Sequence, residues 1–407
     1  MKTIKFYTLG CKVNQYDTQS IRENFLKKGF SEIRGEKKAD FYLINTCSVT
    51  QSADKKSRYL IKRCAKENKN ARIIVTGCLA EKDSKDLSGI KGINYIISKR
   101  FFPDGINNFC GRTRAFLKIQ DGCDNFCSYC KVPLVRGGSR SRPLKEIVYE
   151  AEKLVENGFR EIVLTGICLG SYGKGLAPRR NLVDVINALE KIEGLWRLRL
   201  SSIEANQVTG ELIQKIAASK KLCRHLHIPM QSGDDEILKE MNRKYSRKDY
   251  LELVNKIKRA VPQIAITTDI MVGFPGEKEE NFQNTARLIK EILPLKTHIF
   301  PYSPRQGTRA AGFSNQVAPE IMKLRLCALN NLAEKCSRDF KNKFIKKEFK
   351  VLIESKSKED TGCWEGYTDN YIKVLTASGK NLANRLIRVK IKEIYKDYML
   401  TYRTYNI

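Results

Sequence analysis

The stretch QDGCDNFCSYC, residues 120–130, decides how this chain folds and what it can bind. It places Cys123, Cys127 and Cys130 at a Cys-x3-Cys-x2-Cys spacing, directly after a strand pattern at residues 115–119. Thiolates are the usual ligands of iron–sulfur clusters, and this close spacing lets one loop wrap around such a cluster. A zinc site would normally take four ligands, and no His or further Cys lies close by in the sequence. The loop therefore predicts a four-iron cluster with one open iron.

The composition is that of a basic protein with more than one domain. The chain has 407 residues, of which 42% are hydrophobic, and its 75 Lys and Arg against 45 Asp and Glu give a net charge of +30. Such an excess favours a polyanionic partner, with nucleic acid first, although a merely basic soluble protein stays the alternative. We find no secretory leader and no apolar run of about eighteen residues, so we expect a cytoplasmic protein without a membrane span. Its 13 cysteines then more often bind metal than pair.

Residues 1–112 form the first predicted domain. Strand patterns at residues 4–9, 41–45 and 72–76 alternate with helix patterns at residues 15–28 and 53–68. This alternation predicts an α/β fold with a parallel sheet covered by helices.

Two further domains are predicted. Residues 113–343 repeat a strand–helix unit six times, which predicts a partial (βα)6 barrel with its reactive groups at the carboxyl ends of the strands. Its strands are expected near residues 115–119, 161–164, 197–200, 225–228, 265–272 and 297–301. Residues 344–407 contain strand patterns that predict a small antiparallel β-barrel. These patterns cover residues 348–354, 371–376, 386–395 and 400–405.

Three more cysteines each follow one of the first three predicted strands. They are Cys11, Cys47 and Cys78. Because parallel strands end on one edge of a sheet, these cysteines are expected to converge there. Gly10 and Gly77 beside them would allow the backbone to approach a cluster closely. The residues alone leave an equal alternative, in which the three are buried and act as small hydrophobic side chains.

The loop at residues 120–130 resembles that of the radical S-adenosylmethionine superfamily, and the whole chain is similar to its methylthiotransferases. The latter resemblance rests on TLGCKVN at residues 8–14, NTCSVT at residues 45–50 and Gly77-Cys78. It implies that Cys123, Cys127 and Cys130 hold a [4Fe-4S] cluster whose open iron binds S-adenosylmethionine. It further implies that Cys11, Cys47 and Cys78 hold a second [4Fe-4S] cluster that carries sulfur, and that residues 344–407 are an RNA-binding TRAM domain.

Four stretches are most similar to the branch of this family that acts on N6-threonylcarbamoyladenosine beside the tRNA anticodon. They are residues 9–14, 200–204, 225–233 and 366–371. The resemblance implies insertion of a methylthio group at C2 of that base in the tRNA anticodon stem-loop. It also implies an electron donor such as flavodoxin or ferredoxin, and a sulfur source. We expect a monomer. The alternatives are the same reaction on isopentenyladenosine, and a non-catalytic iron–sulfur RNA-binding protein.

Residues at the ends of the predicted barrel strands are candidates to bind S-adenosylmethionine. They are Thr165, Gly166, Ser202, Glu204, Gln231, Gly273 and Pro275. The sequence Thr165-Gly166-Ile167 departs from the Gly-Gly-Glu of many superfamily members, which puts the contact with the methionine amino group in doubt. Polar residues at these positions suit a ligand, although a solvated loop or a turn explains them as well.

Basic and aromatic residues are candidates to contact the RNA. They are Arg136, Arg140, Arg142, Lys55, Arg58, Lys62, Tyr367 and Tyr371. The three arginines could clamp a carboxylate or phosphate, and the tyrosines could stack on bases. A charged face is often merely solvated, which is the alternative. The three histidines and the remaining seven cysteines show no ligand pattern and are interpreted as structural. Those cysteines are Cys64, Cys110, Cys168, Cys223, Cys327, Cys336 and Cys363.

Overall fold

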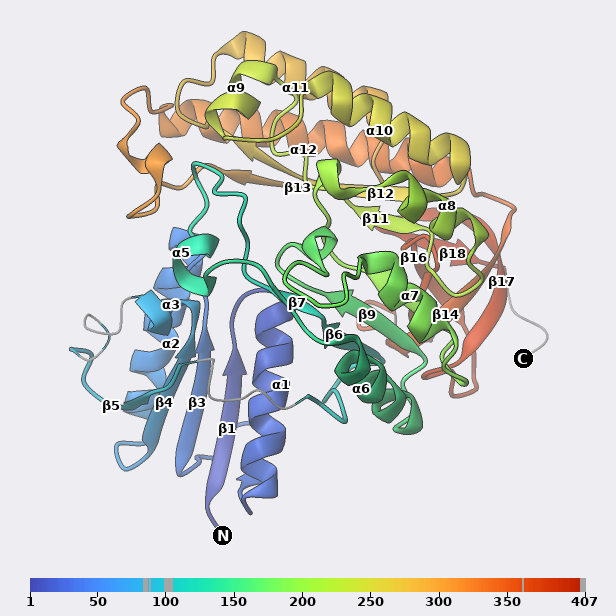
Figure 1. The fold of residues 1–407 in the computed structure, drawn as a ribbon. Helices are drawn as coiled ribbons and strands as arrows, with labels where there is room; N and C mark the ends of the chain where they lie inside the picture. Colours follow the sequence, from blue (N-terminus) through green and yellow to red (C-terminus); the bar gives the residue numbers. More distant parts are fainter. Residues whose placement is uncertain (83–86, 88, 99–104, 361, 403–407) are drawn as a thin grey trace.

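The computed structural model describes residues 1–82, 87, 89–98, 105–360 and 362–402. Figure 1 shows a parallel sheet at the N-terminus, a second set of parallel strands covered by helices, and a small barrel near the C-terminus. The α/β fold class predicted from the sequence is confirmed. In the described part of the chain, no helix has the length and apolarity needed to cross a membrane.

The N-terminal sheet is parallel and has the strand order β2-β1-β3-β4-β5. Its strands are β1 (Thr3–Thr8), β2 (Ser31–Glu32), β3 (Phe41–Thr46), β4 (Arg72–Gly77) and β5 (Ile93–Ile96). Helices α1 (Lys12–Lys27) and α2 (Gln51–Glu67) cover its two faces, and the short α3 (Cys78–Lys82) follows β4. Ile21 of α1 packs against Leu43, and Ile61 of α2 belongs to the cluster around Tyr42 on the other face.

Helix α1 begins earlier than its apolar period predicts. It starts at Lys12, not at residue 15, and Cys11 is its N-cap residue. Gly10 has φ +102°, and a Cβ there would lie 2.9 Å from the Cβ of Cys47. The glycine therefore lets the chain turn out of β1 and enter the helix at once, so Cys11 stays at the edge of the sheet.

The central region contains the six predicted strands, all parallel. They are β6 (Arg114–Lys118), β9 (Glu161–Thr165), β10 (Arg197–Leu200), β11 (His225–His227), β12 (Ala265–Val272) and β13 (Lys296–Pro301). They form the sheets β10-β9-β6 and β11-β12-β13, which are joined by the bridge between Ser202 and His227. Within the described residues β6 does not pair with β13, so the barrel is partial, as predicted.

Helices cover the outside of this barrel. They are α6 (Leu144–Glu156), α7 (Leu182–Glu190), α8 (Gly210–Ala218), α9 (Asp235–Glu240), α10 (Arg247–Ala260), α11 (Glu279–Ile292) and α12 (Pro319–Asn342). The loop regions add α5 (Val132–Arg136), the hairpin of β7 (Gln120–Asp121) and β8 (Arg140–Ser141), and three 3-10 turns. Those turns are η2 (Leu169–Ser171), η3 (Ala205–Gln207) and η4 (Arg309–Gly312). On α6, Ile147, Ala151 and Leu154 are fully buried at the helical spacing that the sequence predicts.

The C-terminal strands close into a barrel with the order β14-β15-β16-β18-β17. They are β14 (Glu348–Lys356), β15 (Cys363–Thr368), β16 (Lys373–Ala377), β17 (Leu386–Tyr395) and β18 (Tyr398–Thr401). Three expectations are corrected. No strand was expected at β15, and the pair β16–β18 is parallel, so the barrel is not purely antiparallel. Tyr371, expected in a strand, lies in a turn with φ +67°. The predicted strand at 400–405 runs partly into residues 403–407, which lie outside the described part.

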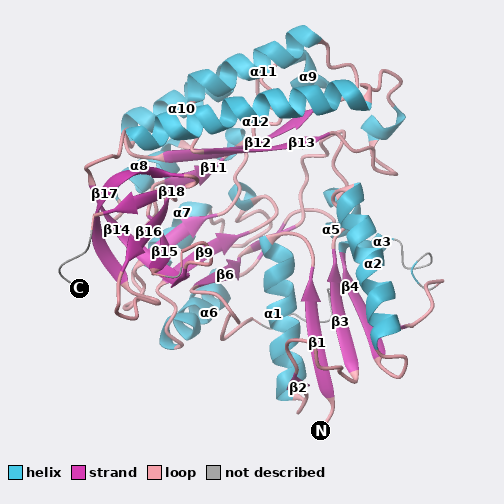
Figure 2. Cartoon of the chain, turned by 180° about the vertical axis from the view of Figure 1, so that it is seen from behind, coloured by secondary structure: helices cyan, strands magenta, loops and turns pink. Residues whose placement is uncertain are grey.

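The C-terminal barrel closes the amino ends of the central strands (Figure 2). Arg197 donates to the carbonyls of Tyr367 and Lys350 at 2.9 and 2.5 Å, and Arg199 donates to those of Thr368 and Asp369 at 3.2 and 3.0 Å. Arginines of strand β10 therefore donate hydrogen bonds to backbone carbonyls of the C-terminal barrel. These bonds fix the orientation of the C-terminal barrel relative to the central strands.

A buried carboxylate balances these arginines. Glu161 has no exposed surface, and its oxygens lie 2.7 Å from Arg199, 3.7 Å from Arg197 and 3.8 Å from Arg114. Burial disfavours the ionised form of Glu161, but the guanidiniums of Arg199 and Arg114 outweigh burial and lower the pKa of this carboxyl. The negative charge of Glu161 is thus part of the interface between the central strands and the C-terminal barrel.

Replacing Glu161 by Gln should destabilise the protein by about 3 kcal/mol, because three guanidiniums would then lie buried around a neutral group. Urea unfolding followed by circular dichroism measures the effect. Glu152→Gln, at an exposed position on α6, is the matched control and should change stability by less than about 0.5 kcal/mol. Equal unfolding midpoints for the two variants would contradict this account of the interface.

Candidate functional site

The cysteines that follow β1, β3 and β4 gather at one edge of the N-terminal sheet. These strands are neighbours, and the register aligns Thr8 with Asn45 and Asn45 with Thr76, so their ends are level. A Cβ on Gly10 would lie 3.0 Å from the Sγ of Cys47, and the thiols of Cys11 and Cys78 both act electrostatically on Cys47. The three thiols that are far apart in sequence therefore share one corner of the structure.

Small and amide-bearing residues shape this corner. Gly77 has φ +101°, and a Cβ there would lie 2.3 Å from the carbonyl oxygen of Thr46. Asn14 is fully buried, donates to the carbonyls of Leu9 and Thr46 at 2.7 and 3.0 Å, and accepts from the Cys78 thiol at 3.9 Å. The loops that carry the cysteines are thus fixed to one another by hydrogen bonds of the Asn14 side chain.

The loop with Cys123, Cys127 and Cys130 leaves the carboxyl end of the first barrel strand. Gly122 has φ +76°, and a Cβ there would lie 2.0 Å from the carbonyl oxygen of Gly138, so only glycine fits. The amide of Cys130 donates to the carbonyl of Cys127 at 2.9 Å, which curls the loop, and the Arg243 guanidinium donates to the Sγ of Cys127 at 3.5 Å. The loop therefore curls back on itself and has a guanidinium beside the Cys127 thiol.

The thiols in both corners suit clusters better than single ions. All 13 cysteines are free of disulfides. Burial raises the pKa of Cys130 to about 12 and also raises the pKa of Cys47, so each holds its proton at neutral pH until a metal replaces it. Among the described residues, no three His, Cys, Asp or Glu side chains are close enough to share one metal ion. A four-iron cluster binds each thiolate on a different iron, so its ligands can lie farther apart than those of a single ion. The two sets of three cysteines therefore suit such a cluster.

Arg136 connects the two corners. Its guanidinium is buried on α5, donates to both carboxylate oxygens of Asp121 at 2.8 and 2.9 Å, and lies 3.3 Å from Asp17 of α1. It also donates to the side chain of Asn14 at 2.5 Å. Asp121 leads into the Cys123 loop and Asn14 supports Cys78, so one side chain ties both sets of cysteines together.

Cys168 was interpreted as structural, but it lies at the Cys123 loop. It follows β9, its amide donates to the side chain of Gln120 at 2.8 Å, and its Sγ accepts from Asn125 at 3.7 Å. A hydrogen bond between the two thiols raises the pKa of Cys123 and lowers that of Cys168. The sequence signal that could have found it is its place just after a barrel strand.

The predicted S-adenosylmethionine contacts all lie at the carboxyl ends of barrel strands. Gln231 has φ +64°, and its buried Oε1 has no hydrogen-bond partner in the described structure, which leaves an acceptor for a ligand. Glu204 pairs with Arg243 at 3.3 Å. The glycine at 273 is required by packing, because a Cβ would lie 2.1 Å from the Cγ of Met322. Contacts of Thr165, Gly166, Ser202, Gly273 and Pro275 with a ligand stay predictions.

The predicted RNA contacts fall into three groups. Lys55 and Lys62 are exposed on α2, beside Arg58, which pairs with Asp54 at 3.0 Å. Arg140 is exposed. Arg136 is bound by Asp121 and Asp17 inside the protein, and Arg142 pairs with Glu150 at 2.7 Å.

Tyr367 and Tyr371 face the central strands. Their rings stack at 5.0 Å, and the Arg114 guanidinium lies 4.7 and 5.5 Å from their centroids. The two rings are therefore part of the closed end of the barrel.

Lys12, the first residue of α1, has an exposed side chain. Partial burial and the nearby guanidiniums of Arg114 and Arg199 lower its pKa. Partial burial also lowers the pKa of His298 on β13.

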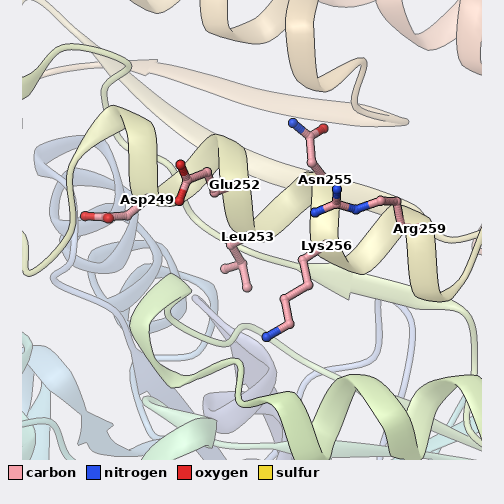
Figure 3. A pocket seen from close by; sticks show the side chains of 6 residues that line it. All are labelled: Asp249, Glu252, Leu253, Asn255, Lys256 and Arg259. Atoms are coloured by element: carbon pink, nitrogen blue, oxygen red, sulfur yellow. The ribbon is translucent and has the colours of Figure 1, made fainter.

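A hollow lies away from these groups. It is on the outer side of α10, where Lys256 extends toward the start of α8 (Figure 3). Its lining includes Asp249, Glu252 and Arg259, and none of the predicted site residues.

Comparison with known proteins identifies two family models. The radical SAM superfamily matches residues 117–289, and the uncharacterized protein family UPF0004 matches residues 3–98. In solved structures, the fold is similar to the radical S-adenosylmethionine methyltransferase TsrM from Kitasatospora setae, with a TM-score of 0.53 at 13% identity over 76% of this chain and 77% of that one. That likeness confirms the fold alone.

Curated relatives match nearly the whole chain. The threonylcarbamoyladenosine tRNA methylthiotransferase MtaB of Bacillus subtilis is 38% identical over 96% of this chain and 94% of the relative. The protein of the same name from Thermotoga maritima is 38% identical over 92% and 91%. The tRNA-2-methylthio-N(6)-dimethylallyladenosine synthase of Clostridium tetani is 34% identical over 94% and 92%. On this similarity, the chain belongs to the radical S-adenosylmethionine family of tRNA methylthiotransferases.

Proposed function

We propose that this enzyme inserts a methylthio group at C2 of N6-threonylcarbamoyladenosine in the anticodon stem-loop of tRNA. The observation that carries the proposal is the pair of three-cysteine corners joined through Arg136, in a chain similar from end to end to enzymes named for that reaction. Relatives named for this base are 34 to 38% identical, and those named for the dimethylallyl base are 34% identical. The isopentenyl base is therefore the second candidate.

We assign three domains to this reaction. Residues 1–112 hold a sulfur-carrying [4Fe-4S] cluster on Cys11, Cys47 and Cys78. Residues 113–343 hold the radical-generating [4Fe-4S] cluster on Cys123, Cys127 and Cys130, together with S-adenosylmethionine. Residues 344–407 are an RNA-binding domain of the TRAM type. When bound, the clusters and S-adenosylmethionine supply the 5′-deoxyadenosyl radical and the methylated sulfur, which acid–base side chains cannot supply.

The chain's own residues position these groups. Without a Cβ, Gly10 and Gly77 leave space beside Cys11, Cys47 and Cys78. Arg136 fixes this group of cysteines relative to the Cys123 loop. The unpartnered Oε1 of Gln231 offers a hydrogen-bond acceptor to S-adenosylmethionine at the strand ends. Lys55 and Lys62 on α2 offer exposed cations to the phosphates of the stem-loop.

Partners and location follow from this assignment. The reaction needs a low-potential electron donor such as flavodoxin or ferredoxin, and a sulfur source. We propose a cytoplasmic enzyme that works as a monomer, because each chain carries both sets of three cysteines.

Replacing Cys11, Cys47 and Cys78 together by Ala should remove about half of the bound iron, because one of two four-iron clusters is lost. Cleavage of S-adenosylmethionine to 5′-deoxyadenosine should continue, since the Cys123 loop is untouched, while methylthio insertion should stop. Iron analysis and product chromatography under anaerobic conditions measure both. The control is Cys327→Ala, at an exposed position outside both corners. Unchanged iron content in the triple variant would reject the second cluster.

Gly77→Ala should have the same phenotype, because its Cβ would enter the carbonyl of Thr46 and push Cys78 out of the corner. Iron should again fall by about half, with cleavage of S-adenosylmethionine retained. Gly29→Ala is the matched control, since Gly29 also has a positive φ but has no atom near the added Cβ. Full iron content in Gly77→Ala would mean that Cys78 keeps its position despite the added Cβ. This result would contradict the close packing of Gly77 against Thr46.

Deleting the gene should abolish the 2-methylthio form of N6-threonylcarbamoyladenosine in cellular tRNA, with its unmodified precursor accumulating. Mass spectrometry of tRNA nucleosides measures both species, and complementation with the intact gene should restore the product. Loss of the 2-methylthio isopentenyl form instead would move the assignment to the second candidate.

A further inference from the structure

The Cys123 loop exposes a large apolar side chain between two of its cysteines. Phe126 directly precedes Cys127, is 60% exposed and has φ +47°. Tyr129, the other aromatic residue of the loop, instead packs against the buried side chains around Phe274. A bulky residue rarely adopts a left-handed backbone, and an exposed ring forgoes the stabilisation that apolar burial gives. The core of the described structure therefore does not account for the position of Phe126.

Two exposed cations lie on the segments that contact this part of the loop. The side chain of Asn242 donates to the carbonyl of Phe126 at 2.9 Å, and the ammonium of Lys244 donates to the side chain of Asn242 at 2.8 Å. Arg309 lies in η4, where the amide of the following residue donates to the carbonyl of Ser128 at 2.9 Å. Lys244 and Arg309 are exposed and form no ion pair within the described residues. We call Phe126, Lys244 and Arg309 the Phe126 surface.

The carboxylates on the same segments do not cancel this charge. Asp124, in the Cys123 loop, pairs with Lys174 at 2.5 Å. Glu240 and Lys239 are exposed neighbours at the end of α9, so together they add no net charge. The Phe126 surface is thus an aromatic side chain with a positive rim, on a chain whose net charge is +30.

The position of this surface limits which partner could use it. Phe126 adjoins Cys127, so a protein that covers its ring comes close to the cluster that the loop binds. An aromatic centre with a polar rim is the usual anatomy of a protein interface. Electron-transfer complexes use small interfaces, and opposite charges raise their rate of association. A protein that delivers electrons here would therefore be small and acidic, with an apolar contact point.

We infer that the Phe126 surface is the docking site for a small acidic electron-transfer protein that reduces the cluster held by Cys123, Cys127 and Cys130. The inference rests on the proposed function, in which this cluster needs a low-potential donor. In this step the donor is oxidised by one electron and the cluster is reduced by one electron, and no covalent bond forms or breaks. Lys244 and Arg309 attract the acidic partner, and Phe126 packs against it.

The test compares two reductants on the reconstituted enzyme under anaerobic conditions, with cluster reduction followed by stopped-flow absorbance and electron paramagnetic resonance. Reduced flavodoxin, an acidic protein, must dock, whereas light-reduced deazariboflavin is small and uncharged. Lys244→Glu/Arg309→Glu should lower the rate of reduction by flavodoxin about tenfold to a hundredfold at low salt, because electrostatic attraction becomes repulsion. The rate with deazariboflavin should change by less than about twofold, because surface charge does not steer an uncharged reductant.

Two further variants separate charge from apolar contact. Lys256→Glu/Arg259→Glu changes the net charge equally at exposed positions of α10, and it should leave the flavodoxin rate within about twofold of wild type. Phe126→Asn removes the ring with a residue that tolerates a left-handed backbone. It should lower the flavodoxin rate at low and high salt alike, because salt does not screen an apolar contact. Iron content shows whether each variant retains its clusters.

The outcomes distinguish this inference from its rivals. Equal losses in the two charge-reversal variants would overturn it, because net charge and not this surface would then set the rate. An equal loss with both reductants would also overturn it, since the surface would then support the cluster itself. Unchanged reduction by flavodoxin would overturn it as well, and weaker binding of the stem-loop would then assign the surface to RNA.

Failure of the proposed function gives a separate result. Normal reduction by flavodoxin, with methylthio insertion only on an isopentenyladenosine stem-loop, would overturn the proposed base and leave the docking site in place.

Discussion

The buried guanidinium of Arg136 is the contact on which the arrangement of this molecule depends. It reaches Asp17 on α1 and Asp121 at the start of the Cys123 loop, and Lys118 pairs with the same two carboxylates. Two cations and two anions thus neutralise one another in a largely buried network, and removing the buried Arg136 would leave the carboxylate of Asp17 without its buried partner, at a cost of several kcal/mol. Because the network is satisfied only in one geometry, it fixes the N-terminal sheet relative to the central barrel.

Helix α1 brings the parts of the site together. Its N-cap is Cys11, which lies near Cys47 at the edge of the N-terminal sheet, and its first turn carries Asn14, which accepts a hydrogen bond from the Cys78 thiol. The same helix lies beside β6, at the flank where the partial barrel is left open (Figures 1 and 2). Because β6 does not pair with β13 in the described part of the chain, the N-terminal domain packs against this open flank of the barrel.

The opposite end of the lumen is closed by the C-terminal barrel. Its turn at Tyr371, with φ +67°, places that ring against His225 at 4.5 Å and beneath the Arg199 guanidinium at 4.7 Å. The barrel floor is therefore polar and rich in cations, and Glu161 neutralises only part of its charge.

The sequence by itself determined what depends on short spacing. The Cys123 loop, the six barrel strands and the three strand-end cysteines of the first sheet were all located from local patterns, because strand alternation and loop length are set by neighbouring residues. Only the tertiary structure decided which distant groups meet. It placed Cys168 against Cys123, made Arg136 an internal link between the two domains and turned Tyr371 toward the barrel. These contacts follow from strand order and domain packing, which bring together residues whose separation in sequence carries no signal.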